Sequence, residues 1–149
     1  MRRILLVQGA NLTYLGKREP AIYGSTTPEQ LDAMPRDHAR AKGYELTIYY
    51  TNVEGDAINH IYEAADRGID GIVMNPAGFT YAGYALKDCV KGVGLPYVEV
   101  HISHIAKRHI HCVLSDVSDG VIFGFGLYGY ILALEAMLYI LAGTGKTEG

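Results

Sequence analysis

Short apolar runs alternate with segments of helical periodicity along the chain, and this alternation limits the folds open to it more than any other feature. The runs lie at residues 4–7, 71–74, 97–100 and 121–123, and residues 45–51 alternate in polarity as a strand does. Each run is long enough for a β-strand and too short for a helix. The helical patterns lie at residues 28–42, 58–65, 84–91 and 127–141.

A repeated strand–helix succession favours a parallel sheet with helices on both faces. We therefore predict an α/β fold, a flavodoxin-like three-layer sandwich with a five-stranded parallel sheet. Pro35 should kink or interrupt the first long helix, because proline lacks the N–H group that continues a helix. Ile58, Ile61, Tyr62 and Ala65 have the spacing of one buried helix face.

Length and composition favour a single soluble domain. The chain has 149 residues, enough for one hydrophobic core. We predict a flavodoxin-like domain over residues 1–142 and a disordered C-terminal tail over residues 143–149. The net charge of −3 gives no basic surface for nucleic acid, and no apolar run reaches the roughly 18 residues of a membrane span. Two cysteines far apart make no disulfide framework, so we expect a cytoplasmic location.

The loop over residues 8–24 is far longer than the roughly two to six residues usual between a strand and a helix, which indicates a functional loop. It carries Arg18 and Tyr23 among breaks in regular structure, as a flap over a ligand would. A phenol is a poor base at neutral pH unless a nearby cation stabilises the phenolate. The pair therefore indicates an arginine-activated tyrosine base. Alternatively, Tyr23 packs under the loop while Arg18 lies in water.

Polar residues follow two of the central apolar runs. Asn75 comes directly after the third run, and His101 comes after the fourth, followed by Ile102 and Ser103. An asparagine amide can hold a carboxylate or orient a water molecule, and a histidine can act as a general acid. The two backbone N–H groups that follow can form an anion nest. Singly, each residue is more often structural, but the carboxyl ends of parallel strands meet at one edge, where ligands bind.

The segments that carry these residues resemble the type II 3-dehydroquinate dehydratases. The most specific are the arginine–tyrosine loop over residues 15–24 and the strand Val98-Glu-Val-His101-Ile-Ser103; shorter matches lie at residues 9–12, 54–55, 75–76 and 124–130. The resemblance runs from about residue 3 to residue 141. It implies a flavodoxin-like catalytic domain, a small cyclic carboxylate as substrate, and no metal or organic cofactor. It also implies homotrimers that often assemble into homododecamers.

The resemblance also implies roles for the matched residues. Tyr23, activated by Arg18, would remove the proton next to the substrate ketone. The resulting enolate would be stabilised through a water held partly by Asn75, and His101 would protonate the departing hydroxyl. Asn11 matches an asparagine that helps to form the active site. The substrate carboxylate would bind at Asn75 and the backbone of Ile102 and Ser103, and Asp88 would reach the site of a neighbouring subunit.

The sequence departs from the family pattern where the substrate's ring hydroxyls would bind. Tyr81 replaces a histidine, and the segment after the fourth run is about three residues shorter. There, either His109 takes the place of the family's arginine or Arg108 reaches round to it. We therefore predict that the elimination chemistry survives and that the enzyme is a 3-dehydroquinate dehydratase. The alternative is an enzyme of the same kind that acts on a related cyclic acid.

Two other functions remain open. Zinc could bind among five potential ligands within a short segment: His101, His104, His109, His111 and Cys112. If that segment is a strand, however, Cys112 points away from His109 and His111. The second is that of a catalytically silent relative retained for assembly.

Overall fold

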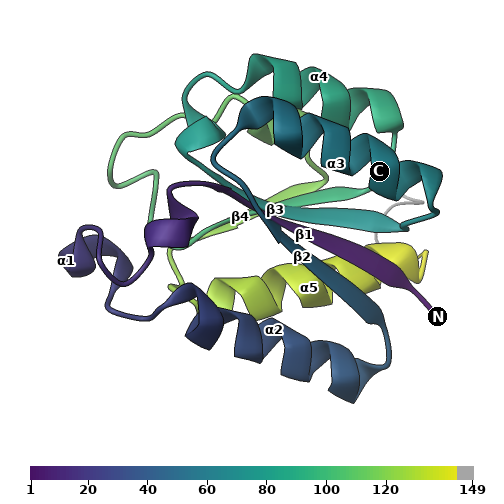
Figure 1. The fold of residues 1–149 in the computed structure, drawn as a ribbon, viewed down its shortest axis with the longest axis horizontal. Helices are drawn as coiled ribbons and strands as arrows, with labels where there is room; N and C mark the ends of the chain where they lie inside the picture. Colours follow the sequence, from purple (N-terminus) through teal and green to yellow (C-terminus); the bar gives the residue numbers. More distant parts are fainter. Residues whose placement is uncertain (144–149) are drawn as a thin grey trace.

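The computed structural model describes residues 1–143. Its five strands form one parallel sheet in the order β2-β1-β3-β4-β5 (Figure 1). The strands are β1 (Arg3–Ala10), β2 (Glu45–Tyr50), β3 (Gly71–Ala77), β4 (Tyr97–His101) and β5 (Gly120–Phe123). The predicted five-stranded parallel sheet is thus confirmed, and its strand order is the flavodoxin-like one. The predicted tail over residues 143–149 lies, apart from Gly143, outside the described residues.

Helices cover both faces of the sheet (Figure 1). One face carries α2 (Pro28–Lys42) and α5 (Tyr128–Leu141), and the other carries α3 (Glu54–Asp66) and α4 (Tyr84–Val93). A short α1 (Pro20–Tyr23) lies in the first loop, and single 3₁₀ turns lie at Leu12–Tyr14, Gly78–Thr80 and Ser115–Val117. Among the helices within residues 1–143, none has the length and apolar character needed to cross a membrane.

The central strand β1 is buried on both faces. Leu5 and Val7 lie in the core beneath α3 and α4, whereas Ile4 and Leu6 lie in the core beneath α2 and α5. This division follows from the period of two in a strand, which sends successive side chains to opposite faces. It explains why the strand reads as a continuous apolar run rather than as an alternating one.

The expectation that Pro35 interrupts the first long helix is wrong. Helix α2 runs without a break from Pro28 to Lys42, and Thr27 and Gln30 form a capping box at its start. Pro35 lies on the buried face with Leu31 and Ala39, at intervals of four residues. The apolar contacts of the proline ring with the core therefore offset the single backbone hydrogen bond that it removes.

The helix predicted around residues 58–65 is present as α3, but its buried face differs from the predicted one. The buried residues are Ala57, Ile61 and Ala64, whereas Tyr62 is 47% exposed. Small alanine side chains let α3 pack closely on the sheet. The predicted spacing had placed Tyr62 on the buried face, whereas the buried stripe runs through residues 57, 61 and 64 and leaves Tyr62 outside it.

Three strands extend further toward the carboxyl edge than their apolar runs indicated. β1 continues to Ala10, β3 continues to Ala77, and β4 includes His101. Gln8 pairs with Asn75, and Ala10 pairs with Ala77. The polar residues at this edge therefore belong to hydrogen-bonded strands, which hold them more rigidly than loops would.

Candidate active site

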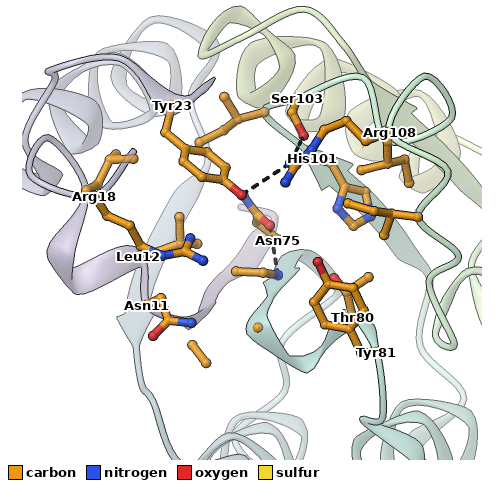
Figure 2. Close-up of a pocket in the computed structure, with 17 residues that line it drawn as sticks. Asn11, Leu12, Arg18, Tyr23, Asn75, Thr80, Tyr81, His101, Ser103 and Arg108 are labelled. Atoms are coloured by element: carbon orange, nitrogen blue, oxygen red, sulfur yellow. Dashed lines mark hydrogen bonds between the residues drawn. The ribbon is translucent and has the colours of Figure 1, made fainter. Parts of the chain in front are cut away.

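A cavity of about 280 Å³ opens at the carboxyl edge of the sheet (Figure 2). The ends of β1, β3 and β4 line it, together with the first loop and the segment after β4. Most of the residues predicted for the site line this one cavity: Asn11, Arg18, Tyr23, Asn75, Tyr81, His101, Ile102 and Ser103. The remaining two, Asp88 and His109, are exposed and are not among the lining residues.

Tyr23 lies between two guanidinium groups. The carbon at the centre of the Arg18 guanidinium is 5.2 Å from the centre of the tyrosine ring, and that of Arg108 is 5.7 Å away. The phenol oxygen accepts a hydrogen bond from Arg108 over 3.2 Å (Figure 2). Arg18, the predicted activator, therefore lies over the ring, while a second arginine contacts the hydroxyl.

Arg108 lines the cavity, a position that sequence reasoning left undecided. Its guanidinium also donates a hydrogen bond to Ser103 Oγ over 2.8 Å, so it joins the first loop to the end of β4. The hydrogen bond with Tyr23 raises the pKa of Arg108 despite the opposing effect of burial. Of the two predicted alternatives, the structure places Arg108 in the cavity, whereas His109 is exposed with a φ of 56°.

His101, the last residue of β4, is buried beside a buried carboxylate. Its Nε2 atom lies 2.9 Å from Glu99 Oε2, and Glu99 is completely inaccessible to solvent. Glu99 also accepts hydrogen bonds from the hydroxyls of Tyr97, over 2.8 Å, and Ser115, over 2.5 Å, and from the thiol of Cys112, over 3.4 Å. Four donors thus surround one carboxylate, which matches its capacity for hydrogen bonds.

These contacts keep Glu99 ionised in spite of its burial. Burial raises the pKa of the Glu99 carboxyl, but the hydrogen bonds from His101, Ser115 and Tyr97 outweigh it and hold the pKa below its usual value. Burial, with the nearby charge of Glu99, raises the pKa of the Cys112 thiol to about 11. Cys112 therefore contacts the carboxylate as a neutral thiol that donates its proton.

Sequence reasoning missed Glu99, although a signal was present. An acidic residue in the middle of a short apolar run has to be paired if the strand is buried. Glu99 is two residues from His101, so both side chains point to the same face of β4. The period of two in a strand could have predicted this pair.

The amide of Asn75 is fixed at both ends. Its oxygen accepts a hydrogen bond from the backbone N–H of Ala77 over 3.0 Å, and its Nδ2 donates to the Tyr130 hydroxyl over 2.8 Å. The Tyr130 hydroxyl in turn donates to Gln8 Oε1 over 2.8 Å.

The backbones of β1 and β3 lie very close together beside Asn75. A Cβ atom at Gly9 would approach the Pro76 carbonyl oxygen to 2.1 Å, so only glycine fits at this position.

Asn11 and Tyr81 lie at the margin of the cavity. Asn11 adopts a left-handed conformation with a φ of 81°, which asparagine tolerates better than most residues. Its backbone N–H donates a hydrogen bond to Asn52 Oδ1 over 2.8 Å. Tyr81 is 62% exposed although its side chain lines the cavity, so it is available to a ligand at the entrance.

The five ligands proposed for a zinc site do not come together. His104 packs against the ring of Phe123, and His109 and His111 are exposed. Within residues 1–143, only His101 and Cys112 of that set belong to a group of potential ligands, and Glu99 is the third member. A site formed by the histidine-rich segment alone is therefore ruled out for this conformation.

The fold and the cavity define an α/β protein with ionisable side chains around one small polar site, and comparison with known proteins identifies its family. The family described as "Dehydroquinase class II" matches residues 2–138. A 3-dehydroquinate dehydratase of Pseudomonas savastanoi is 42% identical, with 98% of this chain and 99% of the relative covered. One from Xanthomonas oryzae is 45% identical, with 93% and 95% covered.

A solved structure gives the same assignment. The type II dehydroquinase of Butyrivibrio crossotus has a TM-score of 0.88 at 39% identity, with 92% of this chain and 97% of that chain covered. The chain belongs to the class II dehydroquinase family. It is therefore an enzyme of the hydro-lyase class.

Replacing Tyr130 with phenylalanine tests how much its buried hydroxyl contributes to the stability of the protein. Tyr130→Phe removes the hydroxyl that joins Asn75 to Gln8 and leaves two buried polar atoms without this partner. We expect the free energy of unfolding in urea to fall by about 1–3 kcal/mol.

Tyr128→Phe is the matched control, because Tyr128 lies on the same helix and is 57% exposed. We expect it to change stability by no more than about 0.5 kcal/mol. Equal losses in the two variants would show that the hydroxyl of Tyr130 does not stabilise the site.

Proposed function

We propose that this enzyme removes water from 3-dehydroquinate, a cyclic β-hydroxy ketone acid, through an enolate intermediate. The observation that carries the proposal is the meeting of two hydrogen-bonded pairs at one cavity, Tyr23 with Arg108 and His101 with Glu99. The relatives named 3-dehydroquinate dehydratase support the choice of substrate.

Tyr23 acts as the base in this proposal. A phenolate needs positive charge at close range, and Arg108 supplies it at the oxygen while Arg18 supplies it over the ring. The phenolate takes the proton from the carbon next to the ketone. The electrons of the broken C–H bond then form the enolate.

His101 acts as the acid. Glu99 orients the imidazole through Nε2 and stabilises its protonated form, so the other ring nitrogen can serve the substrate. That nitrogen donates a proton to the departing hydroxyl, the C–O bond breaks, and its electrons leave with water. The enolate becomes a conjugated enone, and proton transfer from the Tyr23 phenol to the imidazole restores both groups.

Asn75, Ile102 and Ser103 bind the substrate carboxylate in this proposal, and Asn75 also holds the water that stabilises the enolate. The fixed orientation of the Asn75 amide supports this role, because binding then requires no reordering of the side chain. Asn11 completes the wall of the cavity beside Gly78.

A related cyclic hydroxy keto acid is the alternative substrate. Tyr81, where the family pattern has a histidine, offers a phenol in place of an imidazole at the cavity entrance. A site that binds buried hydroxyl groups discriminates strongly when its partners change. Comparing kcat/KM for 3-dehydroquinate with that for analogues altered at the ring hydroxyls would separate the two substrates.

We also propose a homotrimer, which could assemble further into a homododecamer. Asp88 is exposed on α4 and lies outside the cavity, where it could complete the site of a neighbouring subunit. Tyr84, on the same helix, is 60% exposed and offers apolar surface for such a contact. Sedimentation should show an oligomer, and a fully active monomer would contradict the proposal.

The direct test of the proposed function is the reaction itself. Purified protein mixed with 3-dehydroquinate should produce the ultraviolet absorbance of a conjugated enone. Tyr23→Phe should lower kcat by roughly 10²–10⁴-fold, because it removes the proton acceptor and keeps the ring.

Tyr14→Phe is the control for that variant, because Tyr14 belongs to the same loop region and is 58% exposed. It should retain the rate of the unmodified enzyme. Full activity of Tyr23→Phe would contradict the role of the phenol, and a folded protein without any enone signal would rule out this substrate.

A further inference from the structure

The buried side chains of Glu99, His101 and Cys112 form a cluster whose ligand chemistry the proposed reaction does not use. One ligand atom from each lies within 4.8 Å of the other two. All three residues are buried, and their exposed fractions are 0%, 5% and 3%. Carboxylate, imidazole and thiolate together are a ligand set that zinc binds in proteins.

The donors around Glu99 divide into two kinds. The imidazole of His101 and the thiol of Cys112 can bind a metal ion once they give up a proton. The hydroxyls of Tyr97 and Ser115 are poor zinc ligands, but they would still donate hydrogen bonds to a ligating carboxylate. Such outer donors hold metal ligands in place in many metal sites, and here they are already present.

The present separations are close to those of a metal site. Bond lengths of about 2.0–2.3 Å place the ligand atoms of a tetrahedral zinc ion roughly 3.3–3.8 Å apart. Glu99 Oε2 lies 2.9 Å from His101 Nε2, whereas Glu99 Oε1 lies 3.4 Å from Cys112 Sγ. One ligand atom from each residue lies within 4.8 Å of the others, so side-chain shifts of about 1 Å would bring the three to those separations.

The charge of the cluster also suits a divalent ion. One carboxylate and one thiolate neutralise Zn²⁺, so the occupied cluster buries no net charge. The Cys112 thiol and His101 Nε2 each lose one proton to solvent, which leaves a thiolate and a neutral imidazole protonated at its other ring nitrogen. His101 lines the cavity, so the cavity gives an ion a route to the imidazole ring.

We propose that Glu99, His101 and Cys112 form an inhibitory zinc site. The metal takes the place of the protons on the Cys112 thiol and on His101 Nε2. The metal binds Nε2, the imidazole nitrogen that Glu99 otherwise holds. His101 then cannot form the protonated imidazole that donates to the departing hydroxyl. Inhibition rests on the proposed role of His101, whereas binding of the metal does not.

Metal binding is tested without any substrate, using Co²⁺ as the spectroscopic probe. Metal-free protein titrated with Co²⁺ should develop the near-ultraviolet charge-transfer band of a thiolate–cobalt bond, saturating at about one ion per chain. Cys112→Ser should abolish the band, and its serine hydroxyl can still donate to Glu99 and preserve the fold. Circular dichroism checks that fold, and Cys112→Ala serves as the second variant.

Cys89→Ser is the matched control, because Cys89 is the other buried free thiol. The band should persist in this variant. Absence of a thiolate band in the unmodified protein, or its loss in Cys89→Ser rather than in the Cys112 variants, would overturn the proposal.

Inhibition is measured with Zn²⁺ and 3-dehydroquinate, each variant being compared with its own metal-free rate. Cys112→Ser should need at least about 10-fold more Zn²⁺ for half-inhibition, because the site loses its thiolate. His111→Ala, which removes an exposed histidine, should leave inhibition unchanged. Inhibition that depends on His111 and not on Cys112 would show adventitious surface binding and overturn the inhibitory site. If 3-dehydroquinate is not turned over, the proposed function fails while the Co²⁺ titration still decides metal binding.

Discussion

The buried carboxylate of Glu99 is the interaction on which the rest of the site depends. An ionised group removed from water costs several kcal/mol unless it is paired and hydrogen-bonded. Here the strand β4, the turn at Ser115 and the segment at Cys112 all supply donors to it. The same contacts that make the burial tolerable fix the orientation of His101 toward the cavity. One arrangement therefore stabilises the buried carboxylate and positions His101.

The opposite side of the cavity is built differently. Tyr23 belongs to a four-residue helix in the first loop, and its hydroxyl is held by Arg108 from a distant part of the chain. Arg108 also contacts Ser103, so the loop is tied to the end of β4 through a single guanidinium. Tyr23, the proposed base, thus lies on a segment with few buried contacts, and His101, the proposed acid, lies on the rigid sheet. Such a division suits a site that must admit a ligand and then enclose it.

The sheet could be predicted from the sequence because each strand is a short apolar or alternating segment bounded by breaks. Details set by tertiary packing could not be predicted. Pro35 is tolerated because its ring faces the core, and Tyr62 points outward because the small Ala57 and Ala64 bring α3 close to the sheet. Likewise, the contact of Arg108 with Tyr23 joins residues 85 positions apart, and no local pattern encodes it. The pairing of Glu99 with His101, by contrast, could have been predicted, because the period of two in a strand places both side chains on the same face.

The division between a tyrosine base and a histidine acid is tested most directly by separating proton removal from loss of water. In deuterium oxide, a His101→Ala variant should still exchange the proton next to the ketone of 3-dehydroquinate, followed by NMR, while it loses water far more slowly. A variant that combines His101→Ala with Tyr23→Phe should show only the uncatalysed exchange. Exchange that stops in His101→Ala, or that persists at the full rate when Tyr23 is also replaced, would contradict the assignment of base and acid.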